Sequence, residues 1–220
     1  MFVVLPLVLV GLLLVGAARA YRGPLTSPAV LATALGAAGW MALTWGVASS
    51  GVLREWDRTP PPLFILLAAL VVIGPAVAFS SFGSRLVSTV PLWTLIAVQA
   101  FRLPLELSMH AMYERGIMPV QMSYSGFNFD IVTGTTAIVA AWLVHRGQRA
   151  VALWWNLLGL ALLINIVTIA IVSTPRFRYF GDDRLNVWVT YPPFVWLPAV
   201  MVLAAWLGHL LIFRAIARQT

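Results

Sequence analysis

Five polar residues recur at helical spacing in a mainly apolar stretch near the middle of the chain: Gln99, Arg102, Glu106, His110 and Tyr113. On an α-helix these side chains fall within one arc of roughly 80° and extend over about 20 Å. Arginine, glutamate and histidine can hold anions, exchange protons or bind metal ions. Because ionisable groups are costly inside a membrane, the stripe predicts a binding or proton-relay site within a helical bundle.

Arg102 and Glu106 are spaced i, i+4, which suits an ion pair on one helix face. Pro104 lies between them and removes one backbone hydrogen bond of the helix. We expect Arg102 to hold an anionic or carbonyl group and Glu106 to take up or release protons. The alternative is that the pair only fixes this helix against its neighbours.

Two further residues join the predicted site from later segments. Asp130 begins the next apolar segment on the same membrane side, where it shares a helix face with Gly134, Ala137 and Ala141. Asn165 lies on a stripe of the following segment, from which Asn156 faces away, and either hydrogen-bonds across helices or contacts a ligand. The predicted ligand-binding or relay residues are therefore Gln99, Arg102, Glu106, His110, Tyr113, Asp130 and Asn165.

Metal and cofactor chemistry stays open at this stage. Glu106, His110 and Asp130 are suitable metal ligands, although no recognised ligand spacing supports them. Thioethers near His110, from Met109, Met112, Met118 and Met122, would favour Cu(I), but methionine is also an ordinary packing residue. His145 and His209 lie at matching depth and could ligate a haem. Cofactors and catalytic residues remain unknown, and no nucleophile triad, zinc motif or phosphate loop occurs.

The composition identifies the class of protein that must position these residues. The chain is 61% hydrophobic and only 10% charged, with a mean hydropathy of +0.92, which is typical of a multi-span helical membrane protein. The net charge of +7 comes from arginines at segment ends, where lipid headgroups explain it without a nucleic-acid partner. The absence of cysteine and lysine excludes disulfides and Schiff-base chemistry. The arginine-only, Ala/Gly/Val/Pro-rich composition indicates a GC-rich bacterial genome, and we expect the protein in the bacterial inner membrane.

We predict an all-α polytopic bundle of seven spans forming a single transmembrane domain over residues 1–220. The spans are expected at about 2–18, 28–50, 63–79, 89–113, 127–145, 150–173 and 193–213. The first resembles a signal peptide, but its charges follow the apolar run, so it is interpreted as a retained span. Ser80–Ser84 is expected to form a loop before the fourth span.

The arginine distribution orients the predicted bundle. Seven arginines fall on one side without any acidic residue: Arg19, Arg22, Arg85, Arg146, Arg149, Arg214 and Arg218. The opposite side carries six arginines mixed with five acidic residues. Short arginine-bearing loops favour the cytoplasm, so the chain is predicted to be N-out and C-in.

The run from Phe101 to His110, followed by Met118–Met122 and Asn128–Asp130, resembles a signature of uncharacterised bacterial seven-span integral membrane proteins. The resemblance covers roughly 30 residues and implies no activity, but it implies that these positions act together. The sequence thus favours a protein that binds or transports a small ligand or ion at an outward-facing polar site. The alternatives are a membrane-embedded enzyme acting on a lipid or quinone, and a sensor or assembly subunit without catalysis.

Overall fold

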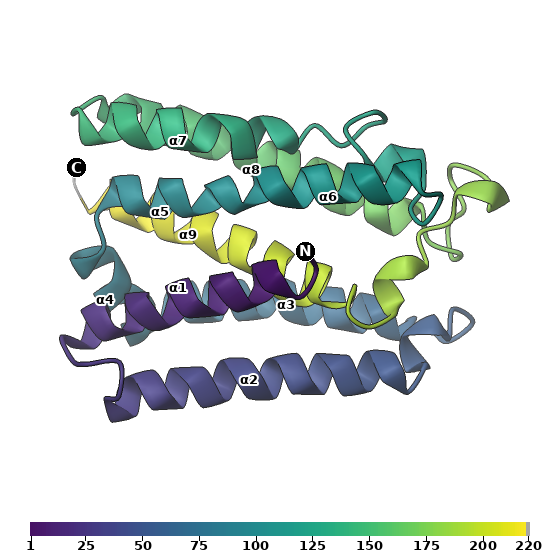
Figure 1. Cartoon of the computed structure of the whole chain (residues 1–220), viewed down its shortest axis with the longest axis horizontal. Helices are drawn as coiled ribbons and strands as arrows, with labels where there is room; N and C mark the ends of the chain where they lie inside the picture. The colour runs from purple at the N-terminus through teal and green to yellow at the C-terminus, as the bar shows by residue number, and fades with distance from the viewer. Residues whose placement is uncertain (219–220) are drawn as a thin grey trace.

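The computed structural model describes residues 1–218 and is an all-α bundle (Figure 1). Its α-helices are α1 (Val4–Tyr21), α2 (Pro28–Ser49), α3 (Pro62–Ala78), α4 (Ser81–Thr89), α5 (Leu92–Val98), α6 (Arg102–Glu114), α7 (Ile131–His145), α8 (Arg149–Val172) and α9 (Leu203–Ala217). A 3₁₀ turn, Gln99–Phe101, joins α5 to α6, and a π-helical segment, Leu197–Val202, leads into α9.

Five helical segments are long and apolar enough to cross a membrane: α1, α2, α3 with Phe79, α8, and the continuous segment Leu197–Ala217. Helix α4 and the segment Leu92–Glu114 together pass the same test, but they meet at a bend of 106°, which raises the number to six. Helix α7 has 15 residues, about 22 Å of helix against a hydrocarbon core of about 30 Å. The chain is thus a multi-span helical membrane protein with five or six candidate spans.

Large apolar side chains cover the outside of the bundle, as contact with lipid requires. Leu35, Val72 and Trp154 are 74%, 67% and 70% exposed, respectively. These fractions would be unfavourable in water for so many large side chains, but hydrocarbon solvates them. The helices therefore contact the lipid bilayer.

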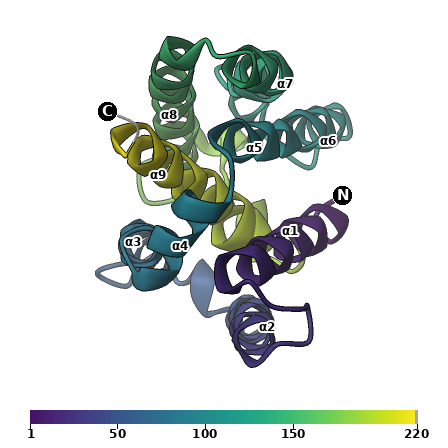
Figure 2. The same ribbon diagram turned by 90° about the vertical axis from the view of Figure 1, so that its left-hand side faces the viewer.

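Helix α9 lies at the centre of the arrangement. Figure 2 shows α9 between α8 and α3, and it packs against both, as well as against α5. In Figure 1 the loops that follow η1 (Val52–Arg54), α6 and α8 gather at one end, and the turns before α2, α5 and α8 gather at the other with the end of α9. The segment that carries the predicted polar stripe thus lies against the bundle's central helix.

The fourth predicted span differs from expectation at its start. Residues 81–89 form helix α4 instead of a loop, because Ser80 caps it by accepting a hydrogen bond from the Gly83 amide at 3.2 Å. Pro91 then begins the new helix direction of α5. The predicted spans 28–50, 63–79 and 150–173 agree closely with α2, α3 and α8, whereas helix α7 begins four residues after predicted position 127.

Candidate functional site

The centre of the site is an ion pair between α6 and the start of α7. Arg102 Nε donates to Asp130 Oδ2 at 2.6 Å, and Nη2 lies 2.5 Å from Oδ1, with the two side chains 1% and 5% exposed. The Arg102–Glu106 pair suggested by the sequence is not formed. Asp130 offers two oxygens to the planar guanidinium and lies at the positive end of α7, so it is the better partner.

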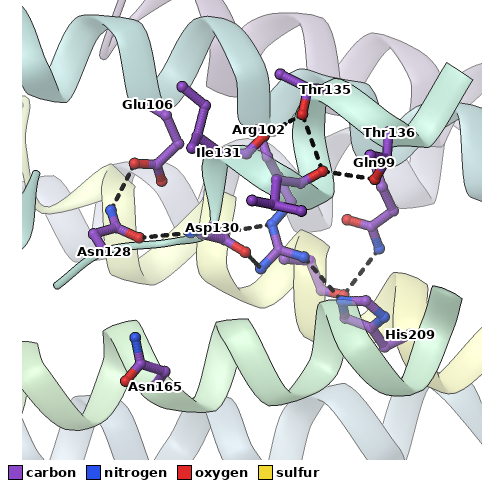
Figure 3. Close-up of polar contacts among 12 residues, drawn as sticks. Gln99, Arg102, Glu106, Asn128, Asp130, Ile131, Thr135, Thr136, Asn165 and His209 are labelled. Atoms are coloured by element: carbon purple, nitrogen blue, oxygen red, sulfur yellow. Dashed lines mark hydrogen bonds and ion pairs between the residues drawn. The ribbon is translucent and has the colours of Figure 1, made fainter. Parts of the chain in front are cut away.

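The other side of Arg102 contacts His209 of α9. Arg102 Nη1 lies 2.9 Å from His209 Nε2, and His209 Nδ1 lies 2.7 Å from Asn156 Oδ1. Arginine can only donate, so Nε2 accepts and the ring proton resides on Nδ1. Asn156 Nδ2 also donates to the His209 carbonyl at 3.1 Å. The network therefore ties α6, α7, α8 and α9 together. Figure 3 shows Arg102 between Asp130 and His209.

Glu106 is held by Asn128 instead of by a cation. Asn128 Nδ2 donates to Glu106 Oε2 at 2.6 Å and to the Met122 carbonyl at 2.9 Å. Asn128 Oδ1 accepts the Asp130 amide at 3.1 Å, an Asx turn that places Asp130 at the head of α7. Glu106 is 2% exposed and has no ion pair among residues 1–218. Its second oxygen, Oε1, has no hydrogen-bond partner among residues 1–218.

Three glycines make the close packing around this cluster possible. A Cβ at Gly134 would overlap the backbone of Leu103, so α7 can approach α6 only at a glycine. A Cβ at Gly159 would come within 2.8 Å of His209 Cε1. At Gly208 it would overlap the amide of Gln99, which is buried and donates to the Ala205 carbonyl at 3.1 Å.

A narrow cavity of about 70 Å³ borders the cluster. A water molecule needs at least about 10–15 Å³ by this measure, so the cavity holds several small groups or one slim ligand. Arg102, Glu106 and Asp130 form its polar wall. The remaining wall is mainly apolar and comes from α3, α6, α8, the π-helical segment and α9, including Leu63, Leu67, Leu105, Met109, Leu163, Ile166, Leu197, Met201 and Ala205.

Three residues of the predicted site lie outside this cluster. His110 lies 2.8 Å from Ser123 Oγ and stacks on Tyr124 with ring centroids 4.2 Å apart. Tyr113 is half-buried next to His110, with ring centroids 5.8 Å apart. Asn165 donates to the Phe127 carbonyl at 2.8 Å and lies apart from the ion pair (Figure 3). Gln99, Arg102, Glu106 and Asp130 are the predicted residues that meet in the interior.

The structure also bears on the metal and haem alternatives. Within residues 1–218, no group of three or more His, Asp or Glu side chains is arranged to hold a metal ion, so Glu106, His110 and Asp130 do not converge. Both ring nitrogens of His209 are engaged, and His145 packs its ring edge-on to Trp93. All four methionines near His110 are buried, which indicates packing: Met109, Met112, Met118 and Met122.

Sequence reasoning missed three members of the network, Asn128, Asn156 and His209. Asn156 of α8 is fully buried, so α8 turns this residue toward the network, whereas Trp154 two positions earlier is exposed. A signal for Asn128 was available, because an Asn two residues before a helix N-cap residue often forms an Asx turn. His209 is a lone histidine on an apolar helix, and its spacing gives no hint of a partner.

The fold and this cluster define the class: a multi-span α-helical membrane protein with a buried polar network. No protein-family model matches the chain, no curated protein matches it, and no solved structure matches it. The resemblance to an uncharacterised membrane protein family therefore gains no support. The function has to be argued from the site itself.

Proposed function

We propose that this protein binds a small amphiphilic ligand in the cavity and couples its transport to proton exchange at Glu106. The observation that carries the proposal is the free oxygen of Glu106. A buried carboxyl group that has neither a cation nor a second hydrogen-bond partner is costly in a membrane interior. A ligand that donates a hydrogen bond to Oε1, or a proton, would satisfy this oxygen.

The apolar wall restricts the ligand class. A hydrated metal ion would have to give up its water shell among leucine and methionine side chains. A slim molecule with an apolar body and one hydroxyl or amine group fits both parts of the cavity. Arg102 directs Nε and Nη2 at Asp130 and Nη1 at His209, so we assign it to positioning Asp130, not to holding an anion.

Two irregular helical segments support a transport role. The 3₁₀ turn Gln99–Phe101 immediately precedes Arg102, and Leu197 and Met201 of the π-helical segment line the cavity. Such segments often mark points where helices bend during function. We further propose that α7 is a seventh crossing, that the chain is N-out and C-in, and that it resides in a bacterial inner membrane.

Dicyclohexylcarbodiimide tests access to Glu106, because this apolar reagent reaches carboxylic acids from within hydrocarbon. Peptide mass spectrometry of detergent-purified protein should find the adduct on Glu106. 1-Decanol should slow labelling about threefold when two thirds of the sites are occupied. Decane, which has the chain but no donor, should not slow it. Absence of the adduct, or equal protection by decane, would contradict the binding site.

Proton exchange is tested separately in proteoliposomes that contain a pH-sensitive dye. The wild-type protein should carry a proton flux that is lost in Glu106→Gln. The matched control is Glu114→Gln, because Glu114 is exposed at the end of α6. Equal flux in the wild type and Glu106→Gln would refute the coupling even if decanol binding is observed.

A membrane-embedded enzyme acting on a lipid or quinone is the second candidate. The observation that favours it is the position of Glu106 and Asp130 in the wall of an apolar cavity. An enzyme would convert a quinol or lipid into a product of different mass during incubation. Elemental analysis for zinc, iron and copper in the purified protein would add support if any were stoichiometric.

A further inference from the structure

A second hollow, of about 630 Å³, lies at the loop-bearing end of the bundle. It is lined by the segment Arg54–Arg58, which precedes α3, and by Pro175, Arg176 and Arg178, which follow α8. Four arginines and two carboxylates face it, so the lining carries a formal charge of 4 − 2 = +2. This hollow is separate from the buried cluster around Arg102.

Most of these charged groups already have partners. Arg58 pairs with Glu55, Arg178 Nη1 lies 2.9 Å from Asp182 Oδ1, and the Arg54 guanidinium lies 4.3 Å from the centre of the Tyr191 ring. Within residues 1–218, Arg176 has neither an ion pair nor a hydrogen bond from its side chain. Asp57 likewise has no partner there. Arg176 is thus the guanidinium available to an added anion.

The loop that carries Arg176 has a defined shape. Arg178 has a φ of 53°, in the left-handed region that residues other than glycine rarely adopt. Its Nε donates to the Pro175 carbonyl at 3.0 Å, and its amide donates to the Thr174 carbonyl at 2.9 Å. An unfavourable backbone conformation held by specific hydrogen bonds indicates a constrained loop at a candidate site.

Aromatic side chains place the hollow at the depth of lipid headgroups. Trp56 lines it, while Phe177 and Tyr179 in the adjoining loop are 56% and 76% exposed. Phe177 stacks on Phe64 at the start of α3, with ring centroids 5.9 Å apart. Exposed aromatic residues at the ends of spans are typical of the membrane–water boundary. The anion that reaches this hollow most readily is therefore the headgroup of an anionic lipid.

We propose that the hollow binds the phosphate of an anionic membrane lipid, with Arg176 as its principal ligand and Arg54 and Arg58 beside it. The planar guanidinium matches two phosphate oxygens and is the usual partner for this group. The lipid's chains then lie along α3, which follows the hollow and exposes Val71 and Val72. This site does not depend on the role of Glu106, and its occupancy can be measured independently.

Native mass spectrometry tests the proposal with protein released from nanodiscs of phosphatidylcholine and phosphatidylglycerol. The wild type should retain phosphatidylglycerol in preference to phosphatidylcholine. Arg176→Gln should weaken retention about tenfold, as expected for losing one charge-assisted contact. Arg184→Gln is the matched control, because Arg184 lies further along the same loop, pairs with Asp183 and does not line the hollow.

Asp57→Asn supplies a second variant that removes a carboxylate from the hollow. It should retain phosphatidylglycerol as tightly as the wild type or more tightly. Equal losses of phosphatidylglycerol retention in Arg176→Gln and Arg184→Gln would show that general surface charge explains the retention. That result would overturn the site. Displacement of the lipid by inorganic phosphate would identify a free-anion site instead, and weaker retention in Asp57→Asn would contradict the assigned charge pattern.

Discussion

Arg102 and Asp130 form a two-point ion pair that joins α6 to the first turn of α7, with Nε and Oδ2 2.6 Å apart. Both side chains are almost completely buried. A buried pair of this kind fixes geometry more than it adds stability, because desolvating two charges offsets their attraction. The pair therefore specifies how α7 is seated, and the loss of one partner leaves a single buried charge.

Removing one partner of this pair should be far more costly than removing an exposed partner. Asp130→Asn should lower the free energy of unfolding by about 3–5 kcal/mol, whereas Asp182→Asn, in the exposed pair with Arg178, should cost less than about 1 kcal/mol. Denaturation in mixed detergent micelles measures both. The double variant Arg102→Met, Asp130→Leu should recover much of the loss. The free energy of unfolding lost in the double variant is compared with the losses in Arg102→Met alone and Asp130→Leu alone. If the double loss equals the sum of these two, the two charges are not coupled.

The sequence was sufficient to locate the membrane helices α2, α3 and α8 and the three acidic or basic residues at the buried centre. Long apolar runs bounded by arginine, proline or serine define these helices, and Arg102, Glu106 and Asp130 stand out because charges are rare between such runs. What the spacing could not provide was the pairing. The i, i+4 rule favours Arg102 with Glu106, but it ignores a carboxylate on a neighbouring helix.

The inward face of α8 was also beyond sequence analysis. Apolar residues surround this helix on all sides, so no amphipathic pattern distinguishes lipid from protein. Asn156 and Asn165 are chemically equivalent candidates there. Only the tertiary contact with His209 places Asn156 inside the bundle and leaves Asn165 bonded to a loop carbonyl.

The hydrogen bonds of His209 predict a single tautomer. Because Arg102 must donate to Nε2, the ring proton resides on Nδ1 and is shared with Asn156 Oδ1. Nitrogen-15 NMR of histidine-labelled protein should therefore show a protonated Nδ1 and an unprotonated Nε2 for His209. Asn156→Ala removes the acceptor and should shift the Nδ1 resonance. Observation of the opposite tautomer in the wild type would be inconsistent with the Arg102–His209 contact.

Gly134 should be intolerant of the smallest substitution. Gly134→Ala places a Cβ against the backbone of Leu103, which cannot move away as a flexible side chain could. The variant should be destabilised, and the Arg102–Asp130 pair should be disturbed with it. Gly36→Ala is the matched control: no atom lies within 4 Å of its added Cβ, and alanine is better than glycine in a helix by about 1 kcal/mol. Comparable unfolding free energies for the two variants would argue against the close approach of α7 and α6.

Helix α7 is proposed as a crossing although it has only 15 residues, and the absence of cysteine from the chain makes this crossing directly testable. Ser125→Cys and Gln148→Cys place single thiols in the exposed loops before and after α7. If α7 crosses, a membrane-impermeant maleimide applied to intact cells should label Ser125→Cys and spare Gln148→Cys, as the N-out, C-in orientation predicts.

Arg58→Cys and Thr26→Cys calibrate the assay, because α2 between them is long enough to span, and only Arg58→Cys should be labelled. Labelling of both loops around α7 would mean that α7 re-enters from the side it left, because 15 residues reach only about 22 Å.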